Sequence, residues 1–189
     1  MHFLSNPGLR GLWTLFMGVW AIAALRGKKV VKRESISSEL SHRIFLIPAI
    51  ALLFLRFPDT PLAHPLFNTN PATILGGEIV TGLGIAYAFW ARFNLGTNWS
   101  GSITLKADHQ LVRSGPYALS RHPIYTGILL AMLGNAVCMG TIAGVIGFAL
   151  AVVAFKRKSL VEEHLLRTQF GEEYGRYAQD VRALIPYVW

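Results

Sequence analysis

The sequence lacks the residues on which several common kinds of protein depend. One cysteine, Cys138, is present in 189 residues, so no intrachain disulfide can form. The six histidines show no metal-ligand spacing, and neither an HExxH pattern nor a cysteine pair occurs. No G-x-S-x-G elbow is present, and Gly82-Leu83-Gly84 is followed by no third glycine. These absences argue against a disulfide scaffold, a metal site, a serine hydrolase and a dinucleotide fold.

Charge is also scarce, and the chain is nearly free of it over long stretches. Charged residues make up 15% of the chain and hydrophobic residues 52%, whereas soluble proteins have roughly 25% charged residues. These nearly uncharged stretches are residues 12–25, 44–55, 72–91 and 124–155, of which the last is long enough for two spans. They are apolar all round rather than amphipathic, which favours membrane helices over the core helices of a soluble protein. The sequence therefore predicts an all-α integral membrane protein of about five transmembrane helices.

The positive charge is distributed in a way that predicts topology. A net charge of +8 is compatible with nucleic-acid binding, but six, four and six of the eighteen Lys and Arg residues lie in segments 26–43, 92–121 and 156–189. No Lys or Arg occurs between Phe57 and Ala91. Cytoplasmic loops of membrane proteins are enriched in Lys and Arg, so we expect these three segments inside and residues 1–10 and 57–71 outside. This gives an N-terminus outside, a C-terminus inside and no nucleic-acid partner.

Two polar regions do not span the membrane. The first, Asn94 to Pro123, is a connector of about thirty residues, and connectors of that length in small domains are usually functional or disordered. The second, Lys156 to Trp189, is predicted to continue the fifth span as a helix that ends at Pro186. Its apolar stripe, formed by Leu166, Phe170 and Tyr174, would lie against the first region beneath the membrane.

The first region contains a run of residues suited to anion binding. Pro123 fits the first turn of the fourth span, which places Arg121 and His122 at the mouth of that helix. Free N–H groups and the positive end of the helix dipole favour an anion or carboxylate there. Interfacial anchoring by Arg, His and Tyr is an equally good interpretation of position alone.

The second region pairs basic and acidic residues. Lys156-Arg157-Lys158 precedes Glu162-Glu163, so the carboxylates could bind a cationic ligand while the arginine holds an anionic one. On its own this segment is better explained as a solvated helix start with acidic residues in its first turn, and we expect Glu163–Arg167 and Glu172–Arg176 as i, i+4 pairs.

Taken together, the two regions resemble a known superfamily. The motifs run L-V-x-x-G-x-Y, R-H-P-x-Y-x-G, an apolar hairpin, E-E-x-x-L, F-G-x-x-Y-x-x-Y and a terminal I-P, from Leu111 to Pro186. Their order resembles the isoprenylcysteine carboxyl methyltransferase and phospholipid methyltransferase superfamily. The resemblance covers residues 94–189 and implies an S-adenosylmethionine pocket on the cytoplasmic side, with a C-terminal interfacial helix. We accordingly expect residues 1–93 to form three N-terminal helices and residues 94–189 the catalytic region.

The resemblance also implies roles for single residues. Arg157 matches an arginine at the substrate end of the eukaryotic carboxyl methyltransferases, and Glu162 is the glutamate implicated with it in catalysis. The expected cofactor-binding residues are Leu111, Val112, Gly115, Tyr117, Arg121, His122, Pro123, Tyr125, Gly127, Glu162 and Glu163.

The chemistry of methyl transfer limits which classes of acceptor suit these residues. A carboxylate is already nucleophilic and needs only a cation such as Arg157 to position it, whereas an amine must lose a proton, for which Glu162 is the better candidate. We expect a lipophilic or lipidated acceptor with a carboxylate of isoprenylcysteine type, ahead of a phospholipid amine or a small thiol. A non-catalytic transporter or sensor is the alternative of another class, but transporters place polar groups at the bilayer midplane within repeated helices, and no repeat is present here. The sequence leaves the oligomeric state open.

Overall fold

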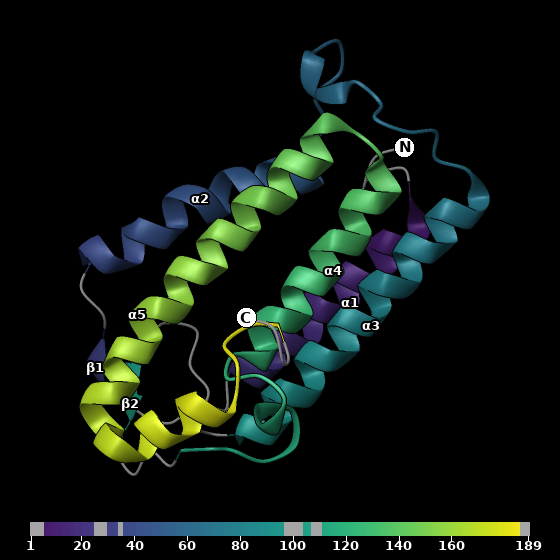
Figure 1. The fold of residues 1–189 in the computed structure, drawn as a ribbon. Coiled ribbons are helices and arrows are strands. Elements are labelled where there is room, and N and C mark those ends of the chain that lie inside the picture. The colour runs from purple at the N-terminus through teal and green to yellow at the C-terminus, as the bar shows by residue number, and fades with distance from the viewer. Residues whose placement is uncertain (1–5, 25–29, 34–35, 97–103, 107–110, 186–189) are drawn as a thin grey trace.

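The structure is a computed structural model in which five helices dominate (Figure 1). It describes residues 6–24, 30–33, 36–96, 104–106 and 111–185. The helices are α1 (Pro7–Ala24), α2 (Ile36–Phe54), α3 (Pro71–Leu95), α4 (Pro123–Met139) and α5 (Ile142–Asp180). Each predicted apolar stretch lies mainly in one of them, and residues 124–155 form the α4–α5 hairpin. Within the described ranges, α2 and α3 are long and apolar enough to cross a membrane, while α4 is apolar but has 17 residues.

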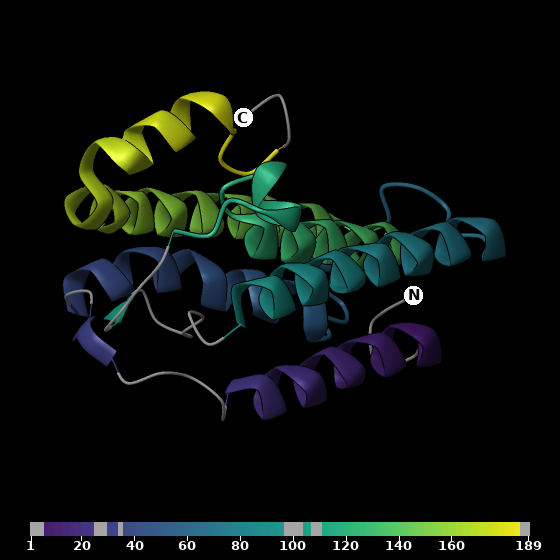
Figure 2. The same cartoon turned by 90° about the horizontal axis from the view of Figure 1, so that it is seen from below.

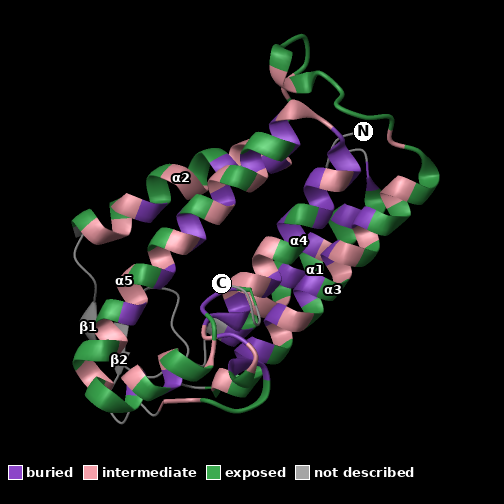
Figure 3. Cartoon of the chain, in the orientation of Figure 1, coloured by how far each residue is buried: buried purple, intermediate pink, exposed green. Residues whose placement is uncertain are grey.

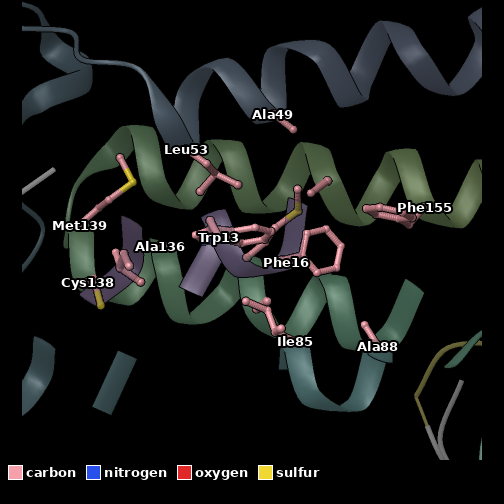
Figure 4. Close-up of a cluster of buried hydrophobic side chains, with 14 of the residues drawn as sticks. Trp13, Phe16, Ala49, Leu53, Ile85, Ala88, Ala136, Cys138, Met139 and Phe155 are labelled. Atoms are coloured by element: carbon pink, nitrogen blue, oxygen red, sulfur yellow. The ribbon is translucent and has the colours of Figure 1, made fainter. Parts of the chain in front are cut away.

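The helices form two groups that are joined at one end. α3 packs along α4, and α2 packs along α5, while α4 and α5 meet at their hairpin turn and diverge toward the opposite end (Figure 1). α1 lies against the α3 side of the molecule (Figure 2). One buried apolar cluster has members on every helix, among them Trp13, Leu53, Ile85, Ala136 and Phe155 (Figure 4). Large apolar side chains are exposed on the outer faces of α2 and α3 (Figure 3).

Glycines allow α3 and α4 to approach backbone to backbone. A Cβ on Gly84 would lie 2.4 Å from the backbone nitrogen of Ala131, and one on Gly127 would lie 2.6 Å from that of Ala88. Gly127, which the resemblance assigns to the cofactor pocket, is therefore needed at this helix contact. Gly144 and Gly147 of α5 also lie close to neighbouring helices, because a Cβ there would lie 3.1 Å from the Ala136 carbonyl oxygen of α4 and 2.9 Å from the Leu53 side chain of α2.

The two ends of the molecule differ in the segments that they hold. The loop after α2 contains the short 3-10 helix η2 (Pro61–Ala63) and packs against the turn between α4 and α5. There the Leu66 N–H donates to the Gly140 carbonyl at 2.8 Å. The described parts of the three basic segments gather at the other end (Figure 1).

A short two-stranded ribbon lies at that basic end, and the rest of the described fold is helical, as the all-α prediction states. β1 (Val30–Arg33) pairs antiparallel with β2 (Thr104–Lys106), with Val30 opposite Lys106 and Arg33 opposite Thr104. The two strands contain β-branched residues, and their pairing satisfies backbone groups that a loop would leave to water.

The helical continuation of α5 beyond Lys156 is confirmed, but the helix is not straight. Gly171 has φ 51° and ψ −125°, so the chain turns sharply there and folds back toward α4 (Figure 2). The helix ends at Asp180, earlier than the predicted end at Pro186, which lies outside the described residues. A left-handed residue stops the regular hydrogen bonding, and glycine adopts it without strain.

Candidate active site between helices α4 and α5

The N-terminus of α4 is held by the C-terminal segment of the chain. α4 begins at Pro123 with His122 as its N-cap residue, as the sequence predicts. The N–H groups of Arg121 and His122 donate to the carbonyls of Arg182 and Ala183 at 2.8 and 3.0 Å. These two N–H groups therefore bind the segment that follows α5.

Two glutamates of α5 meet basic residues from the start of α4. Arg121 donates to Glu163 Oε1 from Nε at 3.0 Å and from Nη2 at 2.6 Å. His122 Nε2 lies 3.2 Å from the same oxygen, and His122 Nδ1 lies 3.3 Å from Glu162 Oε2. The Tyr125 hydroxyl donates to Glu162 Oε2 at 2.8 Å. We refer to these five residues as the charged cluster. Its formation means that Glu163 does not make the predicted pair with Arg167, because α5 turns this carboxylate toward α4.

The charged cluster is buried and internally compensated. The side chain of His122 is 3% exposed, that of Glu163 is 11% exposed and that of Glu162 is 32% exposed. Burial alone would lower the pKa of His122, but hydrogen bonds to Glu162 and Glu163 and their negative charges raise it above its usual value. Burial would raise the pKa of Glu163, but hydrogen bonds from His122 and Arg121 lower it to about 2. Both ring nitrogens of His122 face carboxylate oxygens, which suits the imidazolium form with two N–H donors.

Aromatic side chains flank the cluster on one side. The Tyr125 ring stacks on His122 with centroids 5.4 Å apart and an angle of 2° between the planes. Phe155 packs against Tyr125 at 5.2 Å, and the Lys158 ammonium lies 5.3 Å from the centre of the Tyr125 ring. Neither Phe155 nor Lys158 was predicted from the sequence to belong to the site. The spacing of Lys158 four residues before Glu162 was the signal that both lie on one face of α5.

The four predicted site residues before Arg121 lie beside the cluster. Gly115 opens the 3-10 helix η4 (Gly115–Ala118) with φ 60°, next to Asn94 of α3. Tyr117 is buried, its carbonyl accepts a hydrogen bond from Tyr177 at 2.6 Å, and it packs with Val112 against the start of α4. Leu111 is partly buried at the start of this described segment. The described contacts of these residues are with α3, α4 and the end of α5.

Arg157 lies on another side of α5. Its Nε donates to the Ser41 carbonyl of α2 at 3.0 Å, and its guanidinium lies 5.7 Å from the centre of the Phe45 ring. The structure thus brings Glu162 together with Arg121, His122 and Tyr125, and it places Arg157 against α2. Arg92 of α3 is buried and donates to the Ala23 carbonyl of α1 at 2.6 Å.

Comparison with known proteins relates this region to one family. Residues 78–168 match the isoprenylcysteine carboxyl methyltransferase (ICMT) family, a range that includes both halves of the charged cluster. The chain is 28% identical to protein-S-isoprenylcysteine O-methyltransferase B of Arabidopsis thaliana, over 99% of this chain and 98% of that one. It is 31% identical to protein-S-isoprenylcysteine O-methyltransferase of Schizosaccharomyces pombe, over 71% of this chain and 56% of the relative.

A bacterial relative and a solved structure are also similar. The uncharacterized protein YpbQ of Bacillus subtilis is 30% identical over 60% of this chain and 66% of its own length. The structure of a eukaryotic intramembrane Ras methyltransferase, ICMT, matches 79% of this chain and 63% of its own with 21% identity and a TM-score of 0.46.

Proposed function

We propose that the chain belongs to the isoprenylcysteine carboxyl methyltransferase family and is a membrane methyltransferase that uses S-adenosylmethionine to methylate the carboxylate of an isoprenylcysteine-type acceptor. Relatives that carry this activity in their names match nearly the whole chain. The observation on which the proposal rests is the charged cluster, because it joins α4 and α5 within the matched range.

The residues of the cluster fit the cofactor. S-adenosylmethionine combines cationic groups with a carboxylate and an adenine ring, so its binding needs anionic, cationic and aromatic partners. Glu162 is the more exposed of the two carboxylates and would accept from the cationic groups, while Arg121 and His122 supply donors. Tyr125 supplies an aromatic face.

The other residues predicted to bind the cofactor have supporting positions in this proposal. Pro123 begins α4 and fixes its first turn, and Gly127 brings α4 close to α3. Leu111, Val112, Gly115 and Tyr117 would form the wall beside η4. All of them belong to residues 94–189, which we propose as the catalytic region, with residues 1–93 as the supporting helices.

The role of the protein in the reaction is positioning rather than proton transfer. The bound cofactor supplies an electrophilic methyl group on a sulfonium. Fixed hydrogen bonds between the two glutamates and His122 orient their charges before the acceptor arrives, which reduces the entropy lost on reaching the reactive arrangement. Hydrogen bonds from His122 and Tyr125 outweigh burial and lower the pKa of Glu162, which makes this carboxylate a poor general base. An acceptor without a proton to lose therefore suits the site, which favours a carboxylate over an amine.

We further propose five membrane spans, with the N-terminus outside and the cluster on the cytoplasmic side. α2 and α3 meet the length and hydropathy of a span, and α1, α4 and the first part of α5 lie alongside them. The exposed apolar faces of α2 and α3 suit lipid contact. The cluster lies at the end where the basic segments gather, and the positive-inside rule makes that end cytoplasmic.

A panel of acceptors tests the proposed reaction. Purified protein is incubated with methyl-labelled S-adenosylmethionine and with a synthetic farnesylcysteine bearing a free carboxylate, a phosphatidylethanolamine or an alkyl thiol. We expect label in the farnesylcysteine that mild base releases as methanol, because methyl esters hydrolyse while N-methyl and S-methyl groups do not. The carboxamide of the same farnesylcysteine is the matched control and should stay unlabelled. Base-stable label in the amine or the thiol would contradict the proposal.

A further inference from the structure

The three consecutive basic residues of α5 point in different directions. Successive residues of a helix are rotated by about 100°, so Lys156, Arg157 and Lys158 cannot face the same neighbour. Arg157 faces α2, where it contacts the Ser41 carbonyl and the Phe45 ring. Lys158 faces α4, where its ammonium lies 5.3 Å from the centre of the Tyr125 ring.

Lys158 shares its side of α5 with a carboxylate of the charged cluster. Glu162 follows one helical turn later, and its Oε2 accepts the hydroxyl of the same Tyr125 at 2.8 Å. The charge of Lys158 contributes to the lowered pKa of Glu162. Tyr125 therefore connects the ammonium to the cluster, and Lys158 sits at the border between the cluster and the apolar side chain of Phe155.

Two other described cations near Glu162 and Glu163 are members of the charged cluster, Arg121 and His122. Arg121 donates to Glu163 and to the carbonyls of Ala178 and Val181. His122 lies between the two glutamates with both ring nitrogens. Both residues are proposed above to bind the cofactor, so neither is assigned to the acceptor.

Building on the proposed methylation of a carboxylate, we propose that Lys158 binds the carboxylate of the acceptor and makes the site selective for the acid over its methyl ester. An ammonium is a compact point charge that can hold one carboxylate oxygen and leave the other open for methylation. A guanidinium forms a planar, two-point contact that engages both oxygens. The ester is neutral, so the same ammonium holds the product less tightly than the substrate.

Four variants test this proposal: Lys158→Gln, Lys158→Arg, Arg157→Gln and, as the matched control, Lys156→Gln, which removes the same charge from a different side of α5. For each variant we would measure KM and kcat with farnesylcysteine, inhibition by its methyl ester, and the Kd of S-adenosylmethionine. Lys158→Gln should raise KM for the acid about tenfold or more, the effect of losing a charge-assisted hydrogen bond, with little change in ester inhibition or cofactor Kd. Lys158→Arg should keep KM within a few-fold and lower kcat. Lys156→Gln should behave like the wild type.

Two results would overturn the assignment. One is a Lys158→Gln enzyme that still discriminates the acid from the ester as the wild type does. The other is a loss of that discrimination in Arg157→Gln alone, which would return the role to Arg157. If Lys158→Gln does not fold, Lys158→Arg tests the proposal instead. Wild-type values of kcat and KM in Lys158→Arg would contradict a one-point contact between the ammonium and the carboxylate. A failure of the proposed function has another signature, since the wild type would then methylate no carboxylate at all.

Discussion

His122 is the residue that joins the two glutamates, and its removal tests the charged cluster directly. In His122→Ala, Glu162 and Glu163 lose a buried cationic partner, and breaking a buried ion pair costs about 3–5 kcal/mol of unfolding free energy. We also expect S-adenosylmethionine affinity to fall by about tenfold or more. Calorimetry and thermal unfolding in detergent measure both effects. His164→Ala, at an exposed position on the same helix, is the control, and equal behaviour of the two variants would remove His122 from the site.

The cluster also predicts how stability depends on pH. The pKa of His122 is raised above 6.5 in the fold, so its stabilisation is complete at low pH and is lost as pH rises through the raised value. The pKa of Glu163 is lowered from 4.5 to about 2, so its stabilisation is present above 4.5 and is lost as pH falls toward 2. The unfolding temperature should therefore be highest between these two limbs. His122→Gln should remove the alkaline limb and reduce the acidic one, because Glu163 keeps Arg121 but loses the charge of His122. An unchanged alkaline limb would contradict the assignment.

The sequence predicted the members of the cluster better than their partners. The motif containing Arg121 and His122 and the Glu162-Glu163 pair stood out because polar residues beside apolar spans are few. Helical periodicity suggested Glu163–Arg167 as a local pair, yet the structure pairs Glu163 with Arg121. Local spacing cannot reveal which side of α5 meets α4, and that side decides the partner. The contact of Arg157 with α2 could not be predicted for the same reason.

At the scale of helices, the close packing of α3 on α4 depends on glycine. In Gly84→Ala, the new Cβ would lie 2.4 Å from the Ala131 nitrogen, so the helices must separate. We expect a loss of about 1–3 kcal/mol in unfolding free energy, as for other overpacked interfaces. Gly82→Ala is the control, because its Cβ would meet only the Leu12 side chain, at 3.8 Å. Thermal unfolding of both variants in the same detergent measures the difference, and equal melting temperatures would show that the helices have room.

The bend at Gly171 is the second element that can be tested. Its φ of 51° is strained for a residue with a Cβ, so Gly171→Ala should cost about 1–2 kcal/mol. Because the segment beyond the bend binds the N–H groups of Arg121 and His122, cofactor affinity should fall as well. Gly175→Ala, with open space at its Cβ and no positive φ, is the control. Calorimetry would contradict this role of the bend if the two variants bound S-adenosylmethionine equally.

The positions of the helices could be predicted from the sequence, but the bend at Gly171 could not. Uncharged stretches and Pro123 predicted the positions of the helices and the start of α4, because both signals are local. The turn at Gly171 was missed because the apolar spacing of Phe170 and Tyr174 continues across it. The β1–β2 ribbon was missed because it joins two segments about seventy residues apart in sequence.

For the molecule as a whole, the gathering of basic segments at one end predicts its orientation in the membrane. We expect a cysteine at position 60, in Thr60→Cys, to react with a membrane-impermeant maleimide from outside intact cells. A cysteine at position 175, in Gly175→Cys, should react only after the membrane is opened. Cys138 is buried, so the wild type provides the background. Labelling of both positions from the same side would contradict the proposed five spans.

Isotope trapping tests the central claim, that the charged cluster binds S-adenosylmethionine for methyl transfer to a carboxylate. Protein loaded with methyl-labelled S-adenosylmethionine is mixed with farnesylcysteine and excess unlabelled cofactor, and base-labile label is counted after one turnover. The account predicts that the wild type transfers its bound label, that Glu163→Gln, with a broken cluster, transfers at least tenfold less, and that Glu172→Gln, an exposed glutamate on the same helix, matches the wild type. Equal transfer by Glu163→Gln and the wild type, or no base-labile label from the wild type, would contradict it.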